Sequence, residues 1–331
     1  MKKIRMMALL LAALLCFTGL VSCKEGEPTE EETADIYYTV IFNTSGGDEI
    51  EPRLVKGGTS LNEPETPCRD GFVFDGWYNG SSEWSFSSSV KENMTLTARW
   101  LSADNVFAHT PNSDGETTTI TSIKKTARNI QLPTYIGGYK VTAIGDGVFS
   151  NLSSEDITKI VVHEGIVSIG EEAFSNSSFE IVIEGKITYI GENAFYGCTG
   201  LKAISLGEGL ETVPYAAFEG SGISGIAIPR SVRVIDENAF YNCGALKAVV
   251  ICESLEAISV KAFERTALKA VFFDGSDEAL TALLDGSVAD FNDEILDANK
   301  YIYSATEPVS GKETEYDGFW YYNEKGQTKV W

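Results

Sequence analysis

The apolar residues in the second half of the chain repeat with a period of about 22 residues. Six segments carry apolar residues at matching places and end on a phenylalanine, which follows an alanine in five of them. The six residues are Phe149, Phe174, Phe195, Phe218, Phe240 and Phe263, with spacings of 25, 21, 23, 22 and 23 residues. A repeat of this length indicates a short structural unit that stacks on its neighbours.

A second apolar pattern follows most of these phenylalanines after a short polar turn. It spans six residues with apolar first, fourth and sixth positions, as in 201–206, 223–228, 246–251 and 268–273, and 157–162 fits the same template. This alternation predicts a short β-strand with one buried face. A unit of two short strands and a turn cannot bury its own apolar edge. We therefore expect a mainly β solenoid whose stacked units share one core.

The residue pattern of the repeat resembles that of the BspA-like, or Treponema pallidum type, leucine-rich repeats. Their unit begins Ala-Phe-x-x-Cys-x-x-Leu, and the segments Ala194–Leu201 and Ala239–Leu246 match it closely. Pro229 matches the proline that ends a strand in the family pattern, whereas Pro214 and Asp236 replace a glycine. The resemblance implies a leucine-rich repeat array over 102–275, with a degenerate first repeat as its N-terminal cap.

An aromatic-rich segment, 37–101, precedes the array. Residues 37–42 alternate in the manner of a strand, Gly46 and Gly47 supply a turn, and 71–78 and 94–100 are rich in aromatic and β-branched residues. These motifs resemble the Listeria–Bacteroides repeat, the B-repeat type of internalins. The resemblance implies a small β-grasp-like module of bacterial surface proteins. Trp77 and Trp100 fit either its core or a ligand platform, and the core interpretation is favoured.

The first 36 residues have the features of an export signal and a tether. Residues 1–22 combine a basic start with an apolar run that is too short to span a membrane, which is typical of a signal peptide. Residues 20–23, Leu-Val-Ser-Cys, resemble a bacterial lipobox, which implies lipid modification of Cys23. The following residues, up to 36, are mostly polar and acidic and predict a solvated tether. The sequence thus indicates a lipoprotein anchored in the bacterial cell envelope, on its outer surface.

Composition restricts the chemistry. The 331 residues include 26 Lys+Arg and 48 Asp+Glu, a net charge of −22, which argues against binding to the phosphate backbone of nucleic acids. The two histidines, His109 and His163, have no catalytic arrangement around them, and His163, just after a strand, is expected to be exposed. The GxGxxG match at Gly220–Gly225 precedes a strand instead of a helix, unlike a dinucleotide fingerprint. We therefore predict no enzyme activity, no catalytic or metal-binding residues and no cofactor.

The outward positions of the main strands carry one unusual pattern. Position two holds Thr158, Lys202, Ser224, Lys247 and Lys269, and position five holds Val161, Ser205, Ala227, Val250 and Phe272. An acidic chain thus has a row of lysines beside a small or apolar column. We predict that this face binds an acidic or amphipathic partner, with Val250 and Phe272 as apolar anchors. The alternative is that the lysine stems merely cover and solubilise the sheet.

The last segment, 276–331, loses the repeat. Its first part has helix-like apolar spacing, and its aromatic end suggests a hairpin, so we expect a C-terminal cap. The favoured function is adhesion, or binding of a protein partner on the host matrix or a neighbouring cell. One alternative is a structural spacer or scaffold in the envelope. The other is a glycan-binding accessory lipoprotein that uses exposed aromatic residues such as Trp320, Tyr321 and Tyr322.

Overall fold

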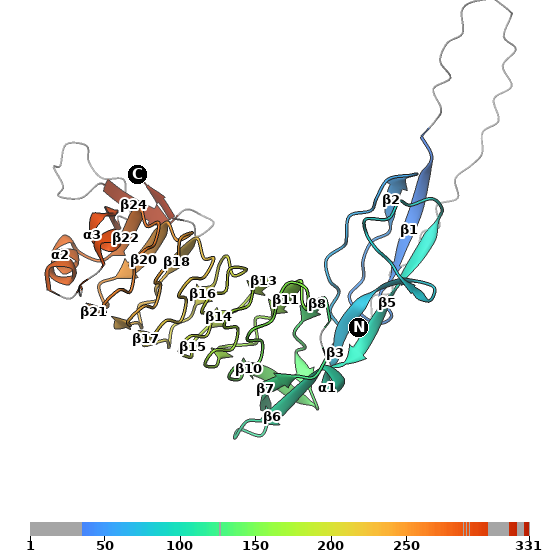
Figure 1. The fold of residues 1–331 in the computed structure, drawn as a ribbon, viewed down its shortest axis with the longest axis horizontal. Helices are drawn as coiled ribbons and strands as arrows, with labels where there is room; N and C mark the ends of the chain where they lie inside the picture. The colour runs from blue at the N-terminus through green and yellow to red at the C-terminus, as the bar shows by residue number, and fades with distance from the viewer. Residues whose placement is uncertain are drawn as a thin grey trace, which may run out of the picture. The chain divides into compact units, whose positions relative to one another are not determined.

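A computed structural model describes residues 35–125, 127–286, 288, 290, 292–303, 318–322 and 328–330 (Figure 1). The side chains of residues 277, 303, 318–322 and 328–330 are outside this description. The described residues from Tyr37 onward belong to one compact unit. The predicted signal peptide, Cys23 and all of the predicted tether except residues 35 and 36 lie outside the described residues.

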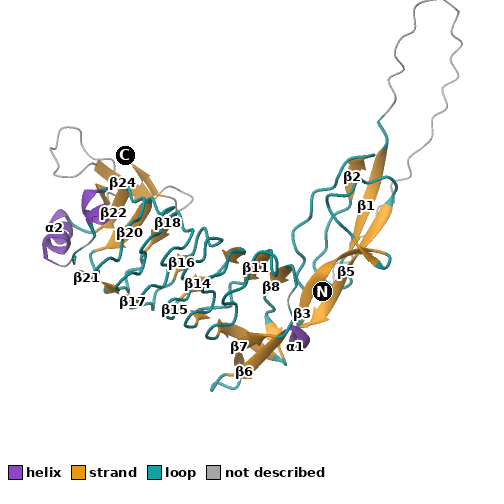
Figure 2. Cartoon of the chain, in the orientation of Figure 1, coloured by secondary structure: helices purple, strands orange, loops and turns teal. Residues whose placement is uncertain are grey.

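The N-terminal module is a five-stranded mixed sheet in the order β2-β1-β5-β3-β4 (Figure 2). Its strands are β1 (Tyr37–Asn43), β2 (Arg53–Lys56), β3 (Phe72–Asn79), β4 (Ser82–Glu83) and β5 (Met94–Ser102). Strand β1 runs parallel to β5, and the other pairs are antiparallel. Alternate side chains turn inward, so Val40, Phe42 and Leu96 pack around Trp77, which is only 2% exposed. The core interpretation of Trp77 is therefore confirmed.

A short helix and a hairpin connect the module to the repeats. Helix α1 (Ala103–Val106) leads into β6 (Phe107–Pro111), which pairs antiparallel with β7 (Thr117–Ile123). Strand β7 then pairs in parallel with β10 (Tyr139–Ile144), the first strand of a regular coil. Strand β9 (Tyr135–Ile136) pairs antiparallel with β10, and β8 (Asn129–Gln131) pairs in parallel with β11 (Lys159–Val162).

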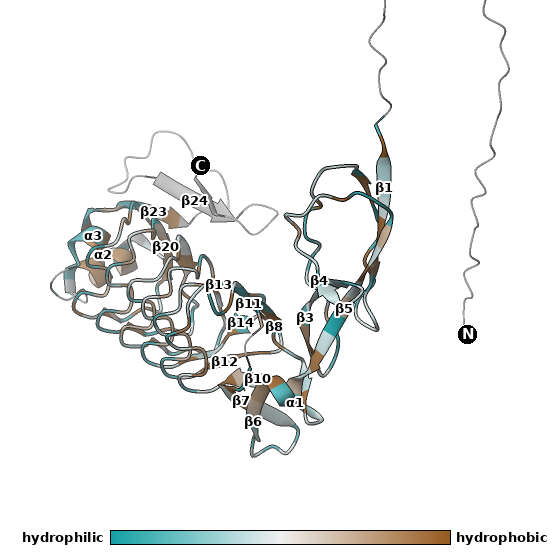
Figure 3. Ribbon diagram, turned by 45° about the vertical axis from the view of Figure 1, so that its right-hand side comes forward, coloured by the Kyte–Doolittle hydropathy of each residue, from teal (hydrophilic) through white to brown (hydrophobic). Residues whose placement is uncertain are grey.

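The array is a mainly β solenoid, as the sequence predicted, and each coil supplies short strands to two rows. One row contains β12 (Ser168–Ile169), β15 (Tyr189–Ile190), β17 (Thr212–Val213), β19 (Val234–Ile235) and β21 (Ala257–Ile258). The other row contains β13 (Glu180–Ile183), β14 (Lys186–Ile187), β16 (Ser205–Leu206), β18 (Gly225–Ala227), β20 (Ala248–Cys252) and β22 (Ala270–Asp274). Pairing between coils is parallel. Figure 3 shows hydrophobic and hydrophilic segments alternating along the coils.

The six repeated phenylalanines form a continuous stack through the array. All six side chains are fully buried. Neighbouring ring centroids are 5.2, 5.4, 5.4, 5.4 and 5.1 Å apart, with interplanar angles of 5–20°. Backbone bonds repeat at the same place, for example from Phe195 N to Ala217 O and from Phe218 N to Ala239 O. The ladder expected from the sequence is therefore confirmed, and it forms the centre of the shared core.

The cysteines in the turns contribute packing and weak hydrogen bonds. Cys198 and Cys243 are free thiols and fully buried, as expected for small apolar side chains. Their Sγ atoms donate to Phe174 O and Phe218 O over 2.8 and 2.9 Å. Burial raises the pKa of the Cys198 thiol to about 12 and that of Cys243 to about 11. Neither thiol therefore has thiolate character at neutral pH.

Each phenylalanine turn contains two residues in the left-handed region. Two places before the phenylalanine these are Gly147, Glu172, Asn193, Ala216, Asn238 and Lys261, with φ between 48° and 64°. Two places after it they are Asn151, Asn176, Gly197, Gly220, Asn242 and Arg265. Glycine and asparagine adopt this region at little cost, which explains why they dominate the turns. Glu172, at φ 53°, is an exposed residue of this set that is neither glycine nor asparagine.

Replacing Glu172 with asparagine should stabilise the protein by about 0.5–1 kcal/mol, because asparagine tolerates the left-handed conformation better than glutamate. Urea unfolding followed by circular dichroism would measure the change. Glu171→Asn is the matched control, since it removes the same charge at an exposed neighbour without a positive φ. An equal gain in both variants would attribute the effect to charge instead of backbone conformation.

The array ends in two helices and an extension of its sheet. Helices α2 (Asp277–Gly286) and α3 (Asp293–Asp297) follow β22, and Leu280, Leu283 and Ile295 join the main core. Strand β23 (Asn299–Tyr303) then pairs in parallel with β22. Strand β24 (Gly318–Tyr322) extends the sheet and pairs antiparallel with β25 (Thr328–Val330).

Candidate interaction surface on the repeat array

The outward face of the second strand row displays the residues that the sequence singled out. In β18, β20 and β22 the fourth and sixth positions of the repeat turn inward, and Ile226, Val249 and Val271 are buried in the main core. The third and fifth positions turn the other way, because successive side chains in a strand alternate between faces. Ala227 and Ala248 are among the residues at these outward positions.

Lys202, Lys247 and Lys269, which we call the lysine row, lie along one border of this face. Their backbones join successive coils: Ser224 N donates to Lys202 O over 3.2 Å, Lys247 N to Ser224 O over 3.0 Å, and Lys269 N to Lys247 O over 2.9 Å. All three side chains are exposed. Lys202 Nζ donates to Thr199 O over 2.6 Å. Within the described residues, the ammonium groups of Lys247 and Lys269 have no hydrogen bond or ion pair.

Val250 and Phe272 form a separate apolar cluster on the outer face. They pack with Ala248, Ala270 and Tyr301, and these five residues are the outer cluster. The rings of Phe272 and Tyr301 stack with centroids 5.3 Å apart. Val250 is 8% and Phe272 9% exposed, so each anchor presents a small apolar area beside its neighbours. Sequence reasoning missed Tyr301, which pairs with Phe272 only because β23 returns to the sheet after two helices.

A polar network borders the opposite side of the outer cluster. Ala227, Val250, Arg230, Asp274 and Glu208 are among the residues that line a hollow of about 390 Å³. Arg230 Nη2 lies 2.7 Å from Asp274 Oδ2, and this carboxylate raises the pKa of Arg230. The Glu208 carboxylate accepts hydrogen bonds from the backbone N–H groups of Arg230 and Ser231. This network could not be predicted from the repeat pattern, because its members come from three different coils.

Acidic residues lie next to Lys269, the last member of the lysine row. Lys269 shares a hollow of about 560 Å³ with Asp293, Glu294 and Asp297 from the region of α3. The lysine row therefore ends beside acidic residues.

The two histidines have structural surroundings. His163 is 8% exposed, so the expectation that it would be exposed was wrong: its ring turns back and its Nδ1 accepts the backbone N–H of Gly165 over 3.0 Å. Burial lowers the pKa of His163. His109 Nδ1 lies 2.9 Å from Thr118 Oγ1. Among the described residues, no group of three or more histidine, cysteine or acidic residues could hold a metal ion.

The architecture of short parallel strands on a shared apolar core defines a leucine-rich repeat protein. The profile of the BspA type leucine rich repeat region matches six copies over residues 103–180 and 168–282, which together are 180 of the 331 residues. The chain therefore belongs to the BspA-type leucine-rich repeat family. The profile of the Listeria-Bacteroides repeat domain matches residues 38–99.

Curated relatives match over short segments. A putative Gly-rich membrane protein of Evansella cellulosilytica is 37% identical over 67 residues, which are 19% of this chain and 8% of that protein. Internalin H of Listeria monocytogenes is 34% identical over 86 residues, 24% of this chain and 14% of that protein. The chain thus spans a small part of the length of these relatives.

Solved structures match over about half of the chain. A leucine rich cell surface protein of Faecalibacterium prausnitzii is 25% identical, with a TM-score of 0.40, over 51% of this chain and 53% of that chain. The leucine rich repeat protein of T. pallidum is 23% identical, with a TM-score of 0.33, over 50% of this chain and 68% of that chain. No helix in the described part of this chain is both long and apolar enough to cross a membrane.

Proposed function

We propose that this chain is a lipid-anchored bacterial surface protein that binds a protein partner through the outer face of its repeat array. The observation that carries the proposal is that the exposed lysine row and the outer cluster lie at neighbouring places of one strand row. Apolar side chains exclude water from a contact, and neighbouring lysines select a partner with carboxylates at the matching distance. An extended surface built from repeated strands suits recognition of a protein better than chemistry on a small substrate.

The proposed location depends on Cys23. The lipobox-like residues 20–23 would allow a diacylglycerol and an acyl chain to hold the mature protein on the membrane. The names of similar proteins, a membrane protein, an internalin and a cell surface protein, support an envelope location. Metabolic labelling with an alkyne-bearing fatty acid should mark the wild-type protein and leave Cys23→Ser unmarked, and protease treatment of intact cells should release the array.

Charge reversal in the lysine row should abolish adhesion. We expect Lys202→Glu/Lys247→Glu/Lys269→Glu to lower binding to immobilised host matrix proteins at least about 100-fold, because three attractive contacts become repulsive. The measurement is surface plasmon resonance with full-length protein at two salt concentrations. Wild-type binding should weaken as salt rises.

The matched control is Lys91→Glu, which changes an exposed lysine in the module instead of the array. It should leave binding unchanged. Saturable binding that survives the triple variant would contradict the assignment of this face. Absence of any saturable partner would favour a structural spacer. The glycan alternative that rests on Trp320, Tyr321 and Tyr322 concerns side chains outside the described part of the structure.

A further inference from the structure

Exposed apolar side chains gather on the first two strands of the module. Nine large hydrophobic residues are exposed in the described part of the chain, and four of them lie within residues 36–54. Three of these four belong to β1 and β2: Tyr37 is 56% exposed, Ile41 46% and Leu54 73%. We call these three residues the module patch. Contiguous apolar side chains on a protein surface mark a place of contact with another apolar surface.

The strand register places the module patch on one face of the sheet. Thr39 of β1 pairs with Leu54 of β2, and Tyr37 and Ile41 are two places before and after Thr39. Side chains two places apart in a strand point to the same side, as do those of directly paired residues. The alternate residues are buried in the module core on the opposite side, namely Val40, Phe42 and Val55. The patch is therefore the outer face of β1 and β2.

The outward positions of β1, β2 and β5, all of which the structure describes, carry two cations and no acidic residue. Besides the patch they hold Thr39, Asn43, Lys56, Thr95, Thr97, Arg99 and Leu101. Lys56 is exposed and pairs with Tyr37. Arg99 is exposed and lies over the ring of Tyr78, 3.7 Å from its centroid. This charge pattern contrasts with the 48 acidic and 26 basic residues of the whole chain.

The place of the patch along the chain indicates its occupant. Tyr37 follows Cys23, the predicted site of lipid attachment, by 14 residues. A flexible segment of this length has an end-to-end distance of about 20 Å and reaches at most about 50 Å. A lipid at Cys23, which is part of the proposed function, would thus keep the patch close to a bilayer at a high local concentration.

The side chains of the patch suit the interface between a bilayer and water. Leucine and isoleucine gain by leaving water for the acyl region, and a tyrosine ring can be buried while its hydroxyl group stays hydrated. Lysine and arginine are attracted to the phosphates of anionic lipids. A second copy of the chain fits less well, because two such faces would bring cations against cations.

We propose that the module patch docks on the surface of a bilayer that contains anionic lipids. Tyr37, Ile41 and Leu54 would enter the headgroup region, with Lys56 and Arg99 beside lipid phosphates. The contact would hold the module against the membrane that the lipid anchor reaches. It rests on the proposed function only for the lipid at Cys23, and it is separate from the lysine row.

The test uses residues 23–331 with Cys23→Ser, which keep the compact unit from Tyr37 onward and have neither a signal segment nor a lipid. Binding is measured by co-sedimentation with phosphatidylcholine vesicles, with and without phosphatidylglycerol. We expect binding at millimolar lipid that is stronger when phosphatidylglycerol is present. Ile41→Ser/Leu54→Ser should weaken it at least about tenfold, because the apolar contact is lost. Lys56→Gln should weaken it about fivefold, and only with the anionic lipid.

The matched control is Val167→Ser/Leu296→Ser, which removes two aliphatic side chains that are 39% and 42% exposed elsewhere in the chain. It should leave vesicle binding unchanged, and circular dichroism establishes that the variants fold. The proposal is overturned if no vesicle is bound at millimolar lipid, or if Ile41→Ser/Leu54→Ser binds as well as its parent or no worse than the control. It is also overturned if light scattering without vesicles shows a dimer that Ile41→Ser/Leu54→Ser abolishes, since a second copy would then cover the patch. This form carries no lipid, so its failure is distinguishable from failure of the fatty-acid labelling of Cys23.

Discussion

Replacing Phe218 with alanine should lower the free energy of unfolding by about 3–5 kcal/mol, the largest effect expected of a single substitution in the array. Phe218 is fully buried between Phe195 and Phe240, with both ring centroids 5.4 Å away. The void cannot close, because backbone hydrogen bonds from Phe195 N to Ala217 O and from Phe218 N to Ala239 O hold the coils at a constant spacing. Urea unfolding followed by circular dichroism would measure the loss.

Tyr215→Ala is the matched control for this prediction. Tyr215 is an aromatic residue of the same coil, three places earlier, and 39% of its side chain is exposed. Its removal should change stability by about 0.5 kcal/mol or less. A repeat array is stabilised by contacts between neighbours, so loss of one central contact should also weaken the cooperativity of unfolding. A loss below about 1.5 kcal/mol for Phe218→Ala would contradict the view that the stack is the centre of the core.

The phenylalanine ladder could be predicted from the sequence because each coil repeats the same pattern of apolar residues. Apolar residues at the fourth and sixth strand positions determine which face is buried, and a phenylalanine at one place per unit determines what fills the centre. Copies of a unit that are stacked in parallel bring identical positions together. The alignment of six phenylalanines in the sequence was therefore enough to expect stacked rings, and the same logic predicted that lysines at one repeat position follow one another from coil to coil.

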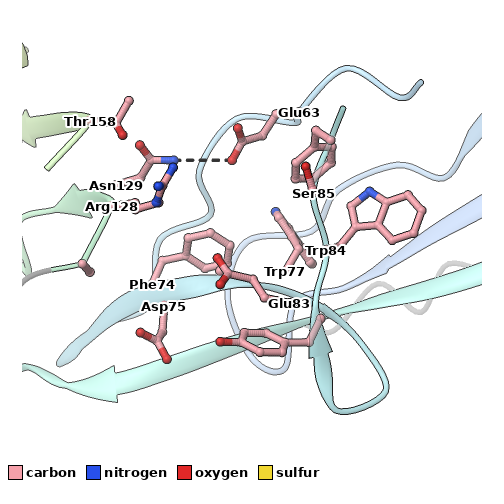
Figure 4. A pocket seen from close by; sticks show the side chains of 14 residues that line it. Glu63, Phe74, Asp75, Trp77, Glu83, Trp84, Ser85, Arg128, Asn129 and Thr158 are labelled. Atoms are coloured by element: carbon pink, nitrogen blue, oxygen red, sulfur yellow. Dashed lines mark hydrogen bonds between the residues drawn. The ribbon is translucent and has the colours of Figure 1, made fainter. Parts of the chain in front are cut away.

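The features that the sequence did not reveal depend on contacts between segments that are not repeats. Tyr301 covers Phe272 only after α2 and α3 have returned the chain to the sheet. His163 is buried because its ring folds back onto the N–H of Gly165, a local turn geometry with no signature in the strand pattern. Asn129 of the repeat region donates a hydrogen bond to Glu63 of the module, a residue far away in the sequence (Figure 4). The period of the repeat gives no information about contacts between segments that are not repeats.

The turns of the array also differ in ways that the repeat pattern hides. Gly200 precedes the strand leucine Leu201, and the equivalent residue before Leu246 is Ala245. The alignment alone would suggest that glycine and alanine are interchangeable here. The structure indicates the opposite for Gly200, since a Cβ atom built on this residue would clash with the backbone carbonyl of Phe179 in the preceding coil.

Gly200→Ala should therefore destabilise the protein by about 2–3 kcal/mol, because the obstacle is a backbone atom and two coils must move apart to admit the methyl group. Gly244→Ala is the control within an equivalent turn: its Cβ would have no atom within 4 Å, and its φ is not positive. That variant should be neutral or slightly more stable, since alanine restricts the unfolded chain. Urea unfolding of both variants measures the contrast. Equal stabilities would mean that the coils slide apart freely, and the rigid spacing inferred from the phenylalanine stack would then be wrong.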